Sequence, residues 1–178
     1  MEILVTSTDL AGLVRDARGG DRAAFGELVR RTQDAMVRTA RALVGDHHDA
    51  EDAAQEAFVV AFGKLGQLRD PASFRAWLFR ILTRTALARR KRPAPRRLGD
   101  GEALVPAREP NGHDRLDALA LEVNRLPDRY RSPLSLHYLA GLTYREVAEV
   151  LGISEKRVKS RLYDARALIR KRLGHGTA

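Results

Sequence analysis

The chain has 178 residues, of which 44% are hydrophobic, and no apolar run approaches the roughly 20 residues that a membrane helix needs, so we expect no membrane insertion. It contains no cysteine, which excludes disulfides, thiolate nucleophiles and cysteine-bound zinc and fits a cytoplasmic location. Lysine and arginine outnumber aspartate and glutamate by 32 to 23, a formal charge of +9 that favours a polyanionic partner such as nucleic acid.

Helical periodicity recurs along the whole chain, whereas β-branched residues do not cluster into strands. The pattern predicts an all-α fold with helices near 9–18, 21–44, 48–65, 71–91, 115–125, 127–140, 143–151 and 154–173. Helix breakers are dense between residues 92 and 113: Pro93, Pro95, Gly99, Gly101, Pro106, Pro110, Asn111 and Gly112. We therefore expect two small helical domains, 9–92 and 114–173, joined by a flexible linker at 93–113.

The first distinctive segment, 46–58, holds five acids and no lysine or arginine in a basic protein. On a helix, Asp49, Asp52 and Glu56 share one stripe, while Ala50, Ala54, Ala57, Ala61 and Leu65 lie on roughly the opposite side. The stripe could be a solvated face whose acids favour the helix N-terminus, or, with His47 and His48, a metal site. A third interpretation is a docking surface for a partner protein, because an acidic stripe cannot hold DNA phosphates.

The second segment, 74–92, combines aromatic and basic residues. Arg80, Arg84 and Lys91 align on one side of the predicted helix, with Trp77 at the border of its apolar stripe. Separated DNA strands are bound by this combination, because unpaired bases stack on rings while guanidinium groups hold phosphates. The alternative for Trp77 is an ordinary core position.

The third segment, 142–173, has the pattern of a helix-turn-helix. Thr143 and Glu146 form a capping box, Gly152 supplies the turn, and Ser154 caps the next helix. The second helix carries eight basic residues against Glu155 and Asp164, with one side formed by Lys156, Lys159, Tyr163, Arg166 and Arg170. A helix that enters the DNA major groove needs such a face, although a solvated charged helix would share the pattern.

Taken together, these segments resemble the extracytoplasmic-function (ECF) group of bacterial sigma factors, from about residue 21 to residue 173. Residues 49–58 look like the polymerase-binding helix of that family, and residues 77–81 look like its −10-element helix. Residues 126–127, 141–148 and 158–162 look like its −35-reading domain. The resemblance implies a non-enzymatic transcription initiation factor without a cofactor.

The resemblance also implies partners and site residues. The partners would be the clamp and flap of core RNA polymerase, promoter DNA and, as a further candidate, an anti-sigma factor. The polymerase clamp would be bound by Asp49, Asp52, Gln55 and Glu56. The −10 element, with one base flipped into the loop at 68–73, would be bound by Arg69, Asp70, Ser73, Trp77, Arg80 and Arg84. The −35 duplex would be bound by Arg157, Lys159, Ser160, Arg161, Tyr163, Asp164 and Arg166.

Three positions depart from the family pattern. Arg84 stands where the family commonly has Asn, Lys156-Arg157 where it commonly has Gly-Thr, and Asp164 where it often has Arg. The base preferences of the family at −10 and −35 therefore do not transfer to this chain.

Two other classes of function compete with this interpretation. A stand-alone helix-turn-helix regulator would explain the C-terminal domain and the net charge, but would leave the acidic stripe and the Trp77 region without a role. A nucleic-acid-processing enzyme would need a paired-carboxylate or histidine-based nucleophilic site, which the sequence does not present.

Overall fold

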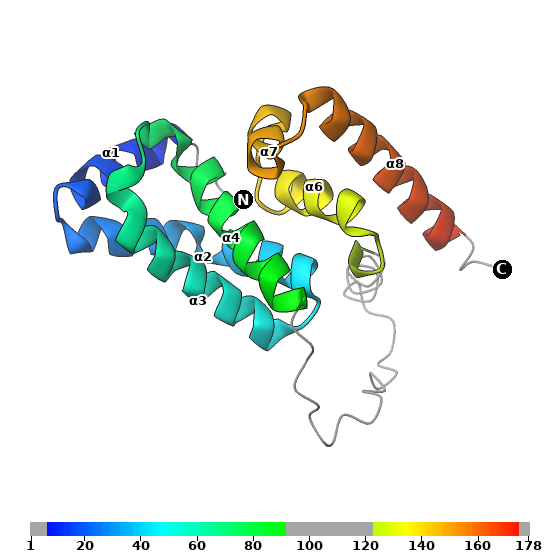
Figure 1. The fold of residues 1–178 in the computed structure, drawn as a ribbon, viewed down its shortest axis with the longest axis horizontal. Helices are drawn as coiled ribbons and strands as arrows, with labels where there is room; N and C mark the ends of the chain where they lie inside the picture. The colour runs from blue at the N-terminus through cyan, green and yellow to red at the C-terminus, as the bar shows by residue number, and fades with distance from the viewer. Residues whose placement is uncertain (1–6, 92–122, 175–178) are drawn as a thin grey trace, which may run out of the picture.

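The structure is a computed structural model that describes residues 7–91 and 123–174, and this part of the chain is helical without strands (Figure 1). The N-terminal part contains α1 (Ser7–Arg18), α2 (Arg22–Val44), α3 (His47–Lys64) and α4 (Phe74–Lys91). Two short 3-10 helices, η1 (Leu65–Gln67) and η2 (Pro71–Ser73), lie between α3 and α4. The C-terminal part contains α6 (Asp128–Tyr138), α7 (Tyr144–Leu151) and α8 (Glu155–Gly174).

The predicted all-α fold is confirmed, and the ends of the helices that can be compared lie within three residues of the predicted ones. One segment differs in type: residues 71–73 were predicted as the start of a long α-helix and instead form η2, because Asp70 caps a separate 3-10 turn there. The predicted linker at 93–113 and most of the predicted helix at 115–125 fall outside the described residues. Among the described helices, none is long and apolar enough to cross a membrane.

Local capping explains where the long N-terminal helices begin and end. The Asp21 carboxylate accepts hydrogen bonds from the backbone N–H groups of Ala23 and Ala24, at 2.8 and 3.1 Å. Gly45 ends α2 in the left-handed conformation with φ 93°, which a residue without a side chain adopts at no steric cost. Asp46 then caps α3 by accepting from the N–H of Asp49 at 2.9 Å. The turn between α2 and α3 is thus determined by two consecutive residues, Gly45 and Asp46.

Alanine side chains form the buried face of α3. The buried residues of α3 are Ala50, Ala53, Ala54, Ala57 and Ala61, and Leu65 continues the face into η1. This face packs against α2 and α4. Small side chains let these helices approach closely, because little volume separates the backbones. The predicted division of α3 into an alanine face and an acidic face is confirmed.

The C-terminal part is the predicted helix-turn-helix. The Thr143 hydroxyl accepts from the N–H of Glu146, and the Glu146 carboxylate accepts from the N–H of Thr143 at 2.8 Å, so the capping box is complete. Gly152 ends α7 with φ 65°, and the Ser154 hydroxyl accepts from the N–H of Arg157 at the start of α8. Val158, Leu162 and Ala165 anchor α8, since all three are fully buried.

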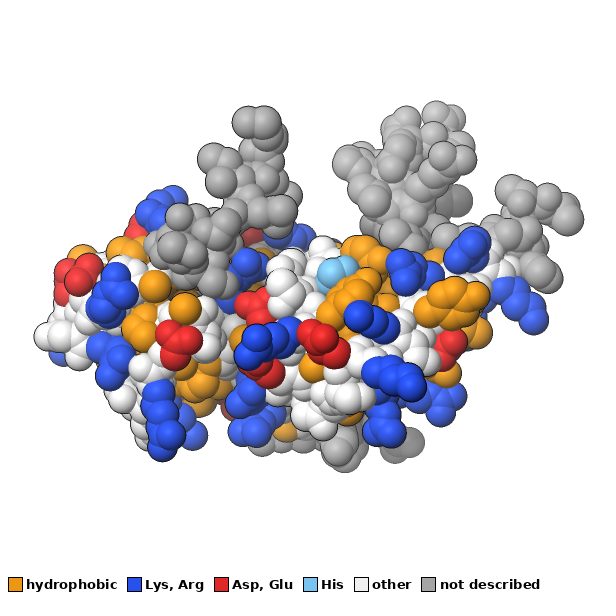
Figure 2. All heavy atoms as spheres, turned by 90° about the horizontal axis from the view of Figure 1, so that it is seen from above, with side chains coloured by type: hydrophobic (Ala, Val, Ile, Leu, Met, Phe, Trp, Pro, Cys, Tyr) orange, Lys and Arg blue, Asp and Glu red, His pale blue; other side chains and the backbone are white. Residues whose placement is uncertain are grey.

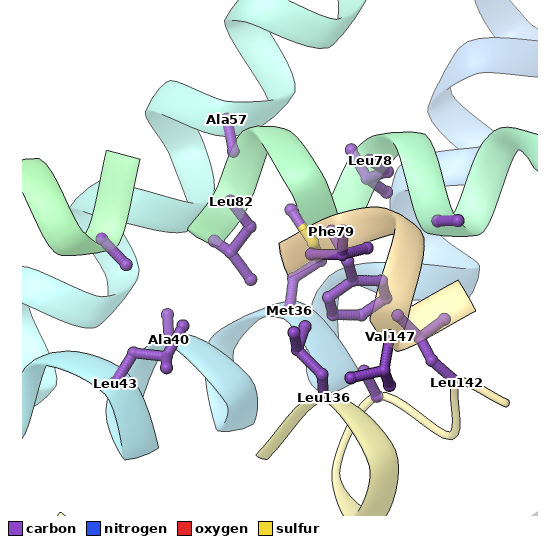
Figure 3. Close-up of a cluster of buried hydrophobic side chains, with 14 of the residues drawn as sticks. Met36, Ala40, Leu43, Ala57, Leu78, Phe79, Leu82, Leu136, Leu142 and Val147 are labelled. Atoms are coloured by element: carbon purple, nitrogen blue, oxygen red, sulfur yellow. The ribbon is translucent and has the colours of Figure 1, made fainter. Parts of the chain in front are cut away.

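The two helical parts also pack against each other. α2 contacts α6, and α4 contacts α7. Figure 3 shows Phe79 of α4 lying among C-terminal side chains, including Leu142 and Val147, with Leu136 of α6 close to Met36 of α2. All of these side chains are almost completely buried, so both parts of the chain contribute to one hydrophobic cluster.

We predict that Ala57→Leu lowers the free energy of unfolding by about 1–3 kcal/mol, because a larger side chain cannot fit between α3 and α4 without moving them. Ala57 is fully buried and lies near Leu82 (Figure 3). Val59→Leu on the same helix is the matched control, since Val59 is 73% exposed. Urea unfolding monitored by circular dichroism measures both variants. Equal midpoints for Ala57→Leu and the wild type would contradict the tight packing of α3.

Candidate polymerase-binding and nucleic-acid surfaces

The acidic surface of α3, formed by Asp49, Asp52, Gln55 and Glu56, is exposed along its whole length. It lies opposite the alanine face that holds α3 in the bundle, so its side chains are not used in packing. The exposed Val59 and Phe62 follow on the same helix, and the Phe62 ring meets Phe25 edge-on at 4.9 Å between ring centroids. The surface therefore offers carboxylates followed by apolar side chains, a composition suited to a protein partner rather than to DNA phosphates.

Arg89 of α4 is a member of this surface that sequence reasoning missed. Its guanidinium reaches across to α3, with Nη1 3.1 Å from Asp52 Oδ2 and Nη2 3.0 Å from Glu56 Oε2. The only signal in the sequence was the basic run at 89–92, which does not say which face of α4 each residue occupies. Two of the four residues of the acidic surface are thus paired within the chain.

The alternative of a metal site on α3 receives no support from the side-chain arrangement. The His47 ring nitrogen Nε2 lies 3.3 Å from Glu51 Oε1, on a different side of the helix from the acidic surface. Within the described residues, no group of three or more histidine, aspartate or glutamate side chains could hold a metal ion.

A recess with a volume of about 300 Å³ lies between α3 and α4. It is lined by Val60, Lys64, Gln67, Trp77, Arg80, Ile81, Arg84 and Thr85. None of these lining residues is acidic, and Trp77 is only partly buried, packed against the core cluster. The predicted grouping of Trp77 with Arg80 and Arg84 is therefore present, and Lys64 of α3 and Gln67 of η1 extend it.

Arg80 makes a hydrogen bond to the C-terminal part of the chain, which the helical pattern did not predict. One terminal nitrogen of its guanidinium donates to the backbone carbonyl of Glu149 on α7, at 2.8 Å. Arg84, one turn further along α4, is exposed, whereas the side chain of Lys91 lies outside the described part of the molecule. The basic face of α4 is thus shared between the recess and the C-terminal part of the chain.

The loop before α4 is held by its own polar side chains. The Asp70 carboxylate accepts from the N–H of Ala72 and from the hydroxyl of Ser73, both at 3.0 Å. The neighbouring Leu68 is buried and Arg69 is exposed. Asp70 and Ser73 therefore already have a structural role in shaping the loop, and Arg69 is the predicted loop residue most available to a ligand.

The exposed face of α8 is the one that the helical pattern predicted, with Lys156, Lys159, Tyr163, Arg166 and Arg170 all exposed. Figure 2 shows many Lys and Arg side chains, and few acidic ones, at the end of the molecule that holds α8. Tyr163 is 69% exposed, which leaves its ring available to a partner. Arg157 and Ser160 are exposed beside this face.

Two residues of the predicted −35 set are less accessible. Arg161 and Asp164 are partly buried at the edge of the α8 face. Asp164 forms no ion pair with Arg161 or Lys171 in the described part of α8. Arg166 bends back along the helix, donating to the carbonyl of Leu162 at 3.2 Å and lying 3.5 Å from the Tyr138 hydroxyl.

Comparison with known proteins identifies the family. The family model described as Sigma-70 region 2 matches residues 28–95, and the one described as Sigma-70, region 4 matches residues 116–169. The RNA polymerase sigma-H factor of Pseudomonas aeruginosa is 33% identical over 178 residues, covering 90% of this chain and 92% of that protein. The ECF RNA polymerase sigma factor SigE of Mycolicibacterium smegmatis is 37% identical over 163 residues. That alignment covers 85% of this chain but 63% of SigE, so the chain spans less than two thirds of that relative.

The fold agrees with this assignment. A solved structure of CnrH in complex with the cytosolic domain of CnrY is 30% identical, covers 93% of this chain and 97% of that chain, and gives a TM-score of 0.74. Both family regions, the relative that is matched over 92% of its length and the fold lead to one conclusion: this chain belongs to the ECF group of the sigma-70 family of RNA polymerase sigma factors.

Proposed function

We propose that the chain binds core RNA polymerase and directs it to promoters, with its charged surfaces divided between the two partners. The observation that carries the proposal is the separation of charge within a sigma-family fold. The acidic surface of α3 has the wrong sign for DNA and is free of packing, whereas α4 and α8 present basic faces. The acidic surface would bind the polymerase clamp, and the basic faces would bind promoter DNA.

The −10 element would be held as a single strand at the recess between α3 and α4. Trp77 offers an aromatic ring for base stacking, and Lys64 and Arg84 offer cations for the adjoining phosphates. Arg69, which lies between η1 and η2 in the loop before α4, would contact the same strand. Asp70 and Ser73 would act mainly by holding that loop in shape, as their hydrogen bonds support.

The −35 element would be read as a duplex by α8. Its N-terminal half exposes Arg157, Lys159, Ser160 and Tyr163, which suit base edges and nearby phosphates in the major groove. Asp164 lies at the edge of this face, where its carboxylate would accept a hydrogen bond from a cytosine amino group. This part of the chain would also touch the polymerase flap.

A regulatory protein is a further proposed partner. The similar protein CnrH has been solved in complex with the cytosolic domain of CnrY. An anti-sigma factor that covers the acidic surface or the basic faces would hold this chain inactive.

Run-off transcription with purified core polymerase tests the proposed function directly. A sigma factor should give promoter-specific transcripts and should need core polymerase for tight promoter binding. A stand-alone helix-turn-helix regulator should instead shift duplex DNA without polymerase. Tight binding to a duplex operator by the chain alone, without any transcript from core polymerase, would favour that second class.

We predict that Asp52→Asn/Glu56→Gln weakens binding to core polymerase more than tenfold, since each charged hydrogen bond contributes about 1.5–3 kcal/mol. Arg89→Ala is the matched control, because it breaks the same internal ion pairs while leaving both carboxylates in place. Fluorescence anisotropy of labelled protein measures the dissociation constants. If Arg89→Ala weakened binding as much as the double variant, the carboxylates would be acting through internal pairing rather than on polymerase.

We predict that Trp77→Leu reduces promoter opening while leaving polymerase binding unchanged, because stacking contributes about 1–3 kcal/mol per base. Leucine keeps the apolar contact of Trp77 with the core, so the domain should stay folded. Permanganate reactivity at −10 on a linear template measures opening, and Arg30→Ala on α2 serves as the control. Wild-type reactivity of Trp77→Leu would remove the recess from the proposed strand path.

A further inference from the structure

The recess between α3 and α4 is rich in hydrogen-bond donors and poor in acceptors. Lys64, Arg80 and Arg84 line it, and lysine and arginine side chains donate hydrogen bonds but cannot accept them. Among the lining residues, only Gln67 and Thr85 carry a side-chain oxygen, and the Thr85 hydroxyl already donates to the backbone carbonyl of Leu82 at 2.9 Å. The recess therefore favours a ligand edge that presents acceptors over one that presents donors.

Arg84 carries the guanidinium of the recess that is open to a ligand. Its side chain is exposed and forms no hydrogen bond or ion pair with the other residues that the structure describes. Arg80 is half-buried, and one of its donors is already used on the carbonyl of Glu149. Lys64 offers a compact ammonium charge, which suits a phosphate, whereas the planar guanidinium of Arg84 offers two parallel N–H donors. Only Arg84 is thus placed to make a bidentate contact.

Arg84 and Trp77 line the recess from the same face of α4. They are separated by about two helical turns, or about 10 Å along the helix axis. Side chains on a helix lean toward its N-terminus, so Arg84 leans toward Trp77 across the turn that carries Ile81. The recess volume of about 300 Å³ is at the lower end of the range for small-ligand sites, about 300–1,000 Å³, and suits a single nucleotide unit. A base stacked on Trp77 would therefore turn one edge toward Arg84.

We propose that Arg84 selects a guanine base in the single strand held at the recess, in addition to the charge that it offers to phosphates. The inference rests on the proposed function of the recess and names the base that it takes. Guanine presents two adjacent acceptors, O6 and N7, and an arginine guanidinium donates to both at once. Adenine has an amino group in place of O6, so a donor of Arg84 would face another donor. A pyrimidine has no N7 acceptor and offers a smaller ring for stacking on Trp77.

Gln67 is the lining residue that favours a different base. A glutamine amide forms a bidentate contact with N6 and N7 of adenine, and Gln67 is exposed at the edge formed by η1. Hydrogen bonds from a charged donor are roughly twice as strong as those between neutral groups, so the contact of Arg84 with guanine outweighs that of Gln67 with adenine. Adenine is therefore the alternative result that the experiment has to separate from guanine.

Selection of single strands by the complete holoenzyme tests the base. The full chain, combined with core polymerase, selects from a library of single-stranded DNA with a randomised segment between thymidine tracts, and core polymerase alone gives the background. Arg84→Lys is the test variant, because it keeps the positive charge and removes the paired donors. Lys64→Ala is the matched control, since loss of a phosphate contact should weaken binding to all strands alike. Circular dichroism and binding to core polymerase establish that both variants are folded and assembled.

The wild type and Lys64→Ala should both enrich guanine at one position, whereas Arg84→Lys should bind single strands without that preference. The best-bound strand is then resynthesised with adenine or with 7-deazaguanine, which lacks the N7 acceptor, in place of the guanine. Either replacement should weaken binding of the wild-type holoenzyme about tenfold, as expected for loss of a bidentate contact. The same replacements should leave binding by the Arg84→Lys holoenzyme nearly unchanged.

The outcomes separate the two levels of the inference. Enriched strands without a preferred guanine, or with adenine in its place, would overturn the choice of base. A guanine preference that persists in Arg84→Lys would overturn the role of Arg84. In both cases the strand site at the recess would stand. If the wild-type holoenzyme enriches no single strand over core polymerase alone, the recess holds no strand, and the function proposed for it is wrong together with the base.

Discussion

Burial of α4 on two sides is the constraint on which the rest of the structure depends. Leu82 faces the alanine side of α3, and Phe79 faces the C-terminal helices. The part of α4 that lines the recess consists of Trp77, Arg80, Ile81, Arg84 and Thr85. One helix therefore completes the N-terminal core, carries the aromatic and basic residues and, together with α2, contacts the C-terminal part of the chain.

The charges of the molecule are distributed according to what each helix packs against. The alanine face of α3 leaves its acids on the outside, while the buried Val158 and Leu162 of α8 leave its cations on the outside. Arg89 of α4 connects the acidic surface with a basic helix, because its guanidinium forms ion pairs with Asp52 and Glu56 and so neutralises part of that surface. A partner that binds the acidic surface must therefore compete with Arg89 or include it.

The net charge of the chain bears on its proposed binding to promoter DNA. A chain with net charge +9 is attracted to any nucleic acid, and this attraction does not depend on sequence. The exposed face of α8 would allow weak encounters with duplex DNA.

Local sequence signals determined the helices and their faces. The capping box at Thr143 and Glu146, the turn at Gly152, the cap at Ser154 and the 3.6-residue period needed only neighbours within about four positions, and the structure confirms them. The acidic surface and the exposed face of α8 followed from the same periodicity. Only the tertiary structure decided the partners of the α4 arginines, which lie 33 to 69 residues away in the chain. A helical period states which residues share a face, but which helix covers that face depends on how distant segments cross and pack.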